Sequence, residues 1–213
     1  MHTLLSQLVE EIGPTDMIWQ IDRLNHMKPC QQEQVSTVRQ EQWSMAQQYI
    51  QHYGVALDCG AHIGECTQQY AERFEQVIAV EPNPTFHECW HLNCDHLSNV
   101  RLHTEALGHR EGRMQRDNPL AQVLTVHDEG EITMHTLDSM KLKELDFIKI
   151  DVDGSEARLL QGATQTIRAL QPVIQIEIKR NRRPEVRRSA LEQLRELGYR
   201  PQARVRSDWI YTT

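Results

Sequence analysis

The sequence has no long apolar run and no linker-like stretch, and these absences narrow its class. No stretch approaches the roughly 20 consecutive apolar residues of a membrane-spanning helix. The N-terminal segment meets Glu10 and Glu11 too early to be a secretory signal peptide. No Gly/Ser-rich or Pro-rich run divides the 213 residues, a length that suits one α/β domain with a full core. We therefore expect a soluble protein of one domain with an N-terminal extension.

The chain also has fewer positively than negatively charged residues, and its cysteines are odd in number. The chain has 23 Lys and Arg residues against 30 Asp and Glu residues, which gives a formal net charge of −7. An acidic chain is a poor general binder of nucleic acids or anionic membranes, so small or neutral partners are expected. The 5 cysteines are an odd number, and two of them, Cys59 and Cys66, fall inside the motif described next. A disulfide framework is therefore not expected, and reduced thiols indicate a cytoplasmic protein.

A strand, turn, helix and strand pattern occupies residues 55–81. The first apolar strand ends in Asp58, and the chain then turns through Gly60 and Gly64 into a helix. A second apolar strand ends in Glu81. Glycines permit a tight turn and close approach to a ligand, and a carboxylate about 20 residues after the first glycine suits ribose hydroxyls. The pattern predicts a nucleotide site.

The turn lacks the third glycine that a dinucleotide-binding G-x-G-x-x-G turn places beneath a pyrophosphate. It carries Asp58 at its mouth instead. That carboxylate would repel a pyrophosphate but tolerate a cation, and S-adenosylmethionine carries an ammonium and a sulfonium. In this block the chain resembles the class I S-adenosylmethionine methyltransferases.

A second acidic block follows a buried strand near residue 150. The strand is expected to end in Asp151, and the chain turns at Gly154 into a helix. The period of 2 places Lys149, Asp151 and Asp153 on a similar side of an extended chain. In a doubly wound sheet this strand lies beside the first strand at the point where ligands bind. Asp151 is therefore expected to face the cofactor.

Two further strands end in acids. A strand at 100–103 leads to Glu105 and Ala106, where Glu105 or the adjacent backbone is expected to accept a hydrogen bond from adenine. A strand at 173–178 carries Glu177 near its end. A carboxylate there is costly unless it has a partner, so Glu177 is either a site residue or the partner of a nearby Arg or Lys.

The remaining segments are less specific. Residues 1–54 are expected to form helices, the third at about 34–52, which either pack on the sheet or cover the substrate crevice as a cap. Residues 55–213 are expected to form the main domain. Residues 108–136 are polar and predict a β excursion near the site, with strands at 123–126 and 132–135.

Two clusters of residues each allow a structural and a functional interpretation. Residues 87–96 contain histidines and cysteines, but the cysteines follow the apolar stripe, so core cysteines with solvated histidines are preferred to a zinc site. A basic cluster either recognises an anionic substrate or is a solvated charge run. Its members are Lys179, Arg180, Arg182, Arg183, Arg187 and Arg188.

Both blocks together resemble the FkbM family of S-adenosylmethionine-dependent methyltransferases. The matching segments are Asp58-Cys-Gly-Ala-His-Ile-Gly64, Val80-Glu-Pro-Asn83, Glu105-Ala-Leu-Gly108, Thr136-Leu-Asp-Ser139 and Phe147-Ile-Lys-Ile-Asp-Val-Asp-Gly154, followed by Glu156, Gly162-Ala163, Pro172 and Glu177. The chain departs from the family's usual pattern at His62, where the family has Asn, and at Asp153, where it has Glu.

The resemblance implies an α/β, Rossmann-like class I methyltransferase fold. It has a seven-stranded, mostly parallel sheet that ends in an antiparallel hairpin, here at about residues 199–212, with helices on both faces. It implies O-methylation of a hydroxyl on a sugar, glycan or polyketide-like acceptor. The cofactor-binding residues expected are Asp58, Gly60, Ala61, His62, Gly64, Thr67, Glu81, Pro82, Asn83, Glu105, Ala106 and Asp151.

For catalysis we expect Asp151 or Asp153 to accept or orient the acceptor's proton, with Lys149 and Glu177 as second choices. Asp151 and Asp153 also have the oxygen ligands that Mg²⁺ prefers, so a metal is an alternative. Two other functions stay open: an NAD-dependent oxidoreductase, and a binding module that keeps the nucleotide pocket without methyl transfer.

Overall fold

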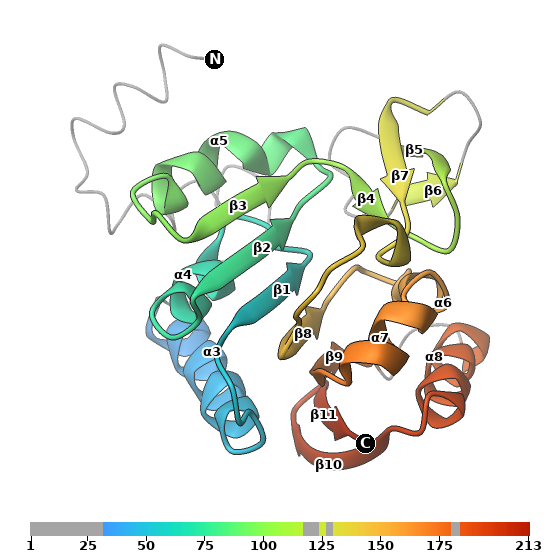
Figure 1. The fold of residues 1–213 in the computed structure, drawn as a ribbon. Helices are drawn as coiled ribbons and strands as arrows, with labels where there is room; N and C mark the ends of the chain where they lie inside the picture. The colour runs from blue at the N-terminus through green and yellow to red at the C-terminus, as the bar shows by residue number, and fades with distance from the viewer. Residues whose placement is uncertain (1–31, 117–123, 127–129, 180–183) are drawn as a thin grey trace.

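The computed structural model describes residues 32–116, 124–126, 130–179 and 184–213 (Figure 1). The two helices expected before residue 32 lie outside this range, as do Val123 and Arg180 to Arg183 of the predicted strand and basic cluster. Within the described residues, no helix is both long and apolar enough to cross a membrane.

The main sheet has 7 strands in the order β10-β11-β9-β8-β1-β2-β3. Its strands are β1 (Val55–Cys59), β2 (Gln76–Val80), β3 (Val100–His103), β8 (Phe147–Ile150), β9 (Val173–Glu177), β10 (Arg200–Val205) and β11 (Asp208–Thr212). The first five pair in parallel, whereas β11 is antiparallel to both β9 and β10. The predicted mostly parallel sheet with a terminal hairpin is confirmed.

The central strands are short apolar runs because helices cover both of their faces. Figure 1 shows α3 (Gln32–Gln47), α4 (Glu65–Ala71) and α5 (Pro84–Cys94) on one side of the sheet, and α6 (Glu156–Gln161), α7 (Thr164–Leu170) and α8 (Pro184–Glu196) on the other. Successive residues of β8 pack on opposite faces of the sheet: Phe147 packs with Tyr70 of α4, and Ile148 packs with Leu159 of α6. The prediction of helices on both faces is confirmed.

The helix α3 is fixed to this sheet by aromatic side chains. The ring of Trp43 lies 5.1 Å from that of Tyr70 and 5.8 Å from that of Phe147. The helix ends at Gln47, five residues before the predicted end, because the last turn tightens: the backbone N–H of Gln48 bonds the carbonyl of Met45.

A second, smaller sheet lies beyond the carboxyl end of β3 (Figure 1). Its strands are β4 (Ala106–Leu107), β5 (Gly112–Arg116), β6 (Leu124–Val126) and β7 (Ile132–His135), in the order β4-β7-β5-β6. The strand expected at 132–135 is confirmed. The strand β5 was not singled out within the predicted β excursion: this polar segment is a strand because β6 and β7 pair with it on both sides.

The strand β8 ends at Ile150, one residue before the predicted end. The backbone N–H of Asp151 still bonds the carbonyl of Cys59, but the chain then turns, and Asp153 has φ of 49°. The expectation of one extended chain from Lys149 to Asp153 was therefore wrong. Asp153 lies in a turn, and its left-handed conformation is one that Asp adopts more readily than most residues.

Candidate functional site

A cavity of about 230 Å³ opens at the carboxyl ends of β1, β2, β8 and β9. It lies at the edge of a parallel sheet where ligands commonly bind. Nine of the predicted site residues line it: Gly60, His62, Glu81, Pro82, Asn83, Ala106, Asp151, Asp153 and Glu177. The structure therefore brings together residues from both acidic blocks of the sequence.

The glycine turn after β1 forms part of the cavity wall. Gly60 has φ of 83°, and a Cβ atom there would lie 1.9 Å from the backbone oxygen of Asp151, so only glycine fits. The backbone N–H groups of Gly60 and Ala61 both donate to the carbonyl of Val80 at the end of β2. His62 has φ of 52°, a left-handed conformation that is enriched in histidine and asparagine. The turn is thus fixed between two strand ends.

Glu81 presents a fixed carboxylate to the cavity. Its Oε2 accepts a hydrogen bond of 2.8 Å from the backbone N–H of His62, and its Oε1 accepts one of 2.8 Å from that of Asn83. Burial raises the pKa of Glu81 to about 7, although both backbone donors favour the charged form. Each oxygen retains a lone pair, so the carboxylate can accept further hydrogen bonds from a diol.

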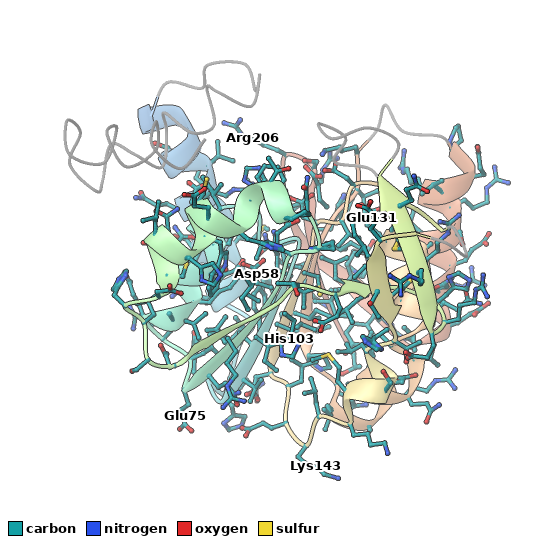
Figure 2. The ribbon with its side chains drawn as sticks, turned by 90° about the horizontal axis from the view of Figure 1, so that it is seen from above. Asp58, Glu75, His103, Glu131, Lys143 and Arg206 are labelled. Atoms are coloured by element: carbon teal, nitrogen blue, oxygen red, sulfur yellow. The ribbon has the colours of Figure 1, made fainter. Side chains whose placement is uncertain are left out.

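Asp58 and Lys149 do not line the cavity. Figure 2 shows Asp58 in the interior of the molecule. Asp58 Oδ1 is 3.2 Å from Lys149 Nζ, and Asp58 Oδ2 accepts a hydrogen bond of 2.7 Å from Thr67 Oγ1. Lys149 Nζ also donates to the carbonyl of Gly60 at 2.8 Å. Burial alone would lower the pKa of Lys149, but the nearby negative charges, Asp58 above all, raise it above its usual range. The ammonium stays charged and supports the turn from below.

Four other predicted cofactor residues also lie outside the lining: Ala61, Gly64, Thr67 and Glu105. At Gly64 a Cβ atom would lie 2.4 Å from Cys94 Sγ, so this glycine is needed for the packing of α4 against α5. Glu105 is partly exposed and lies 3.8 Å from His103 Nδ1, while its neighbour Ala106 lines the cavity.

Asp151, Asp153 and Glu177 form a carboxylate cluster whose oxygens lie within 4.8 Å of one another. Lys179 Nζ lies 3.1 Å from Asp153 Oδ1 and 2.7 Å from Glu177 Oε2. Glu177 therefore lines the cavity and is also a partner of Lys179. In the described part of the chain this cluster is the one group of acids, histidines or cysteines close enough for a metal.

The electrostatic environment shifts the pKa values of Asp151 and Glu177 in opposite directions. Burial would raise the pKa of Asp151, but the Lys149 ammonium and a hydrogen bond with Glu177 lower it below its usual value. Burial, and then the charge of Asp151, raise the pKa of Glu177. The environment therefore favours the ionised form of Asp151 over that of Glu177, while the Lys179 ammonium against Glu177 opposes the rise of its pKa.

The histidines and cysteines of 87–96 do not converge. Cys89 and Cys94 are buried in the core, as preferred from the sequence. His87 Nε2 bonds the carbonyl of Glu81, and the exposed His91 Nδ1 bonds Asp95 Oδ1.

Sequence reasoning missed several lining residues, among them Arg39, Met114, Val152 and Ser155. Arg39 is the most informative, because it comes from α3. A signal was present: Arg39 lies three and four residues before Gln42 and Trp43, on the helix face that contacts the sheet. An arginine on a buried stripe needs an anionic or polar partner.

Comparison with known proteins identifies this architecture. The family model described as the methyltransferase FkbM domain matches residues 58–201, more than half of the chain. No curated protein matches the chain.

Solved structures share the fold. A methyltransferase FkbM from Methylobacillus flagellatus has a TM-score of 0.56 at 21% identity, over 78% of this chain and 45% of that one. This chain thus spans less than half of that protein. The precorrin 8w decarboxylase of Methanobacterium thermoautotrophicum has a TM-score of 0.53 at 20% identity, over 88% and 92% of the two chains. A SAM-dependent methyltransferase from Aquifex aeolicus has a TM-score of 0.50 at 14% identity, over 94% and 98%.

Proposed function

The chain belongs to the FkbM methyltransferase family, and on that premise we propose that it transfers a methyl group from S-adenosylmethionine to a hydroxyl of a sugar, glycan or polyketide-like small molecule. One observation carries the proposal. A single cavity joins the fixed carboxylate of Glu81 at β2 to the carboxylate cluster at the ends of β8 and β9. The first suits a nucleoside, and the second suits an acceptor that loses a proton.

The residues on the β2 side fit the nucleoside part of the donor. The lone pairs of Glu81 suit the two ribose hydroxyls, and the apolar side chains of Phe86 and Leu107 supply walls for a flat base. Gly60 lines the cavity without a side chain, because a Cβ atom there would clash with the backbone of Asp151. When bound, the donor supplies an electrophilic methyl group on a sulfonium. We also propose that the second sheet contributes to choosing the acceptor, because Met114 of β5 lines the cavity.

Asp151 is the base in this proposal. Its ionised carboxylate accepts a hydrogen bond from the acceptor hydroxyl and takes the proton as that oxygen becomes bonded to the methyl carbon, whose bond to sulfur breaks so that S-adenosylhomocysteine is the leaving group. A weak base suffices, because the oxygen becomes strongly acidic as the new bond forms. Glu177 donates a hydrogen bond that holds Asp151 in place and in its charged form. The main contribution of the protein is alignment of the reactants and exclusion of water.

The carboxylate cluster does not need Mg²⁺ in this proposal. Its oxygens are suitable ligands, but the Lys179 ammonium already lies against Asp153 and Glu177. A divalent cation at the same oxygens would be repelled by this charge. Lys179 therefore supplies the positive charge that a metal would otherwise bring.

Calorimetry with S-adenosylhomocysteine and with NAD⁺ tests the function. We expect the first to bind and the second not to bind. Binding of NAD⁺ alone supports the oxidoreductase, and failure of S-adenosylhomocysteine to bind at millimolar concentration overturns the proposal. Binding without methyl transfer to any acceptor in a broad screen of sugars and glycans supports a binding module instead.

A further inference from the structure

Arg39 brings a positive charge from α3 to the cavity. In the described part of the lining the other Lys or Arg is Lys179, which is held by two carboxylates. The contacts of Arg39 are weaker. Its Nη1 donates to Gln42 Oε1 at 3.2 Å, and its Nε lies 3.8 Å from Glu65 Oε2, with side chains that are 28% and 24% exposed. An ion pair at this distance, with both side chains about a quarter exposed, contributes little, so the guanidinium retains capacity for an anion.

The position of Arg39 is fixed by a buried polar network. Gln42 Nε2 donates to Asp208 Oδ2 at 2.6 Å, and Asp208 Oδ1 accepts a hydrogen bond of 3.0 Å from Gln175 Nε2. Asp208 is 2% exposed. This network joins α3 to β11 and β9, so Arg39 is part of a wall built into the fold.

Arg39 reaches the cavity beside the start of α4. Its neighbour Glu65 is the first residue of α4, directly after the glycine turn. Glu81 and Phe86 belong to the end of β2 and to α5. An elongated ligand whose ribose meets Glu81 therefore extends across the turn toward Arg39. The amino-acid end of S-adenosylmethionine carries a carboxylate, which is the one anionic group of that molecule.

We propose that Arg39 binds the carboxylate of the donor's amino-acid part, so that α3 completes the donor site. The proposal rests on the function proposed above. It follows that residues before β1 are part of the cofactor site, in addition to any role at the acceptor. A guanidinium matches a carboxylate with two parallel hydrogen bonds, which lysine cannot reproduce.

Calorimetry with two ligands tests this assignment. The probes are S-adenosylhomocysteine and its decarboxylated analogue, which keeps the nucleoside, the sulfur and the amine. We expect Arg39→Met to weaken binding of S-adenosylhomocysteine by about 10- to 100-fold and to leave binding of the analogue almost unchanged. The affinity of Arg39→Lys for S-adenosylhomocysteine is expected to lie between that of the unaltered protein and that of Arg39→Met. Arg101→Met, at an exposed position of β3 outside the cavity, is the matched control.

The assignment is overturned if Arg39→Met and Arg39→Lys lose affinity equally for both ligands. It is also overturned if neither ligand loses affinity. Thermal unfolding of each variant identifies a loss of affinity that comes from misfolding. If Arg39→Met is misfolded, the affinities of Arg39→Lys for the two ligands decide whether Arg39 binds the carboxylate. Failure of the unaltered protein to bind either ligand overturns the proposed function itself, whereas binding of both with equal affinity overturns only the role of Arg39.

Discussion

Asp58 and Lys149 are register partners on the adjacent parallel strands β1 and β8, and their charged atoms lie 3.2 Å apart with side chains that are 0% and 3% exposed. The pair lies directly under the glycine turn, because Lys149 also donates to the carbonyl of Gly60. From the sequence, both residues were expected in the site itself. In the structure, the pair supports the turn that lines the site.

Loss of Lys149 is expected to be costly for stability. In Lys149→Met the carboxylate of Asp58 loses its ionic partner while buried, which should lower the free energy of unfolding by about 3–5 kcal/mol. The double variant Asp58→Asn with Lys149→Met should recover part of this loss, because the buried Asp58 carboxylate is then removed as well, whereas Asp151, 3.9 Å from Lys149 Nζ, still loses its neighbouring charge. Urea unfolding measures both, with Lys143→Met at an exposed position as control. A double variant no more stable than Lys149→Met would show that the charge of Asp58 is not what makes the loss of Lys149 costly.

Asp151 is expected to be needed for turnover and not for donor binding. Asp151→Asn should lower the rate of methyl transfer by about 10²- to 10⁴-fold, measured as formation of S-adenosylhomocysteine with an acceptor found by screening. Glu177→Gln should have a smaller effect, since its amide can still donate to Asp151. Asp153→Asn should have the least, because the carboxylate of Asp153 pairs with Lys179. If Asp153→Asn alone abolishes transfer, the base has been assigned to the wrong acid.

The raised pKa of Glu81 predicts a pH dependence of stability. Its pKa rises from 4.5 to about 7 on folding, so the folded state holds the proton more tightly. The contribution of Glu81 is fully present below pH 4.5 and is lost as the pH rises toward 7, by up to roughly 3 kcal/mol. The free energy of unfolding of Glu81→Gln should therefore fall less over this range than that of the unaltered protein. Parallel curves for the two proteins would show that Glu81 keeps its ordinary pKa.

Removal of divalent cations is expected to leave methyl transfer unchanged. The physical reason is the ammonium of Lys179, which already neutralises part of the carboxylate cluster. Activity in EDTA should equal activity in added Mg²⁺. As a positive control, Lys179→Met should bind Mg²⁺ more tightly than the unaltered protein, because the variant leaves the carboxylates without their cation. Activity that is lost in EDTA and restored by Mg²⁺ would show that methyl transfer requires the cation.

Local sequence patterns were sufficient for the units built from neighbouring residues. The turn from β1 through Gly60 to α4, the acid at the end of β2 and the strand at 132–135 all follow from periodicity and glycine positions. The placement of β8 beside β1 follows from the topology of doubly wound sheets.

The contacts that decide side-chain roles come from distant residues and were not predictable in this way. The charge of Lys149 is directed to Asp58 by strand register, and Glu177 meets Asp151 only because β9 lies beside β8. Arg39 reaches the cavity because α3 docks on the sheet. The polar strand β5 is likewise defined by its neighbours rather than by its own composition.

The two departures from the family pattern have a local explanation. His62 and Asp153 both have positive φ, at 52° and 49°. Histidine and aspartate are among the residues that adopt this conformation most readily, so each turn is kept with the replacement. The shorter carboxylate of Asp153 is then within reach of Lys179.

A crystal structure of the complex with S-adenosylhomocysteine tests the central claim most directly. We expect both ribose hydroxyls within hydrogen-bonding distance of the Glu81 carboxylate, and the sulfur directed toward Asp151 and Glu177. A nucleoside bound elsewhere, or with its ribose turned away from Glu81, would contradict the proposed donor site.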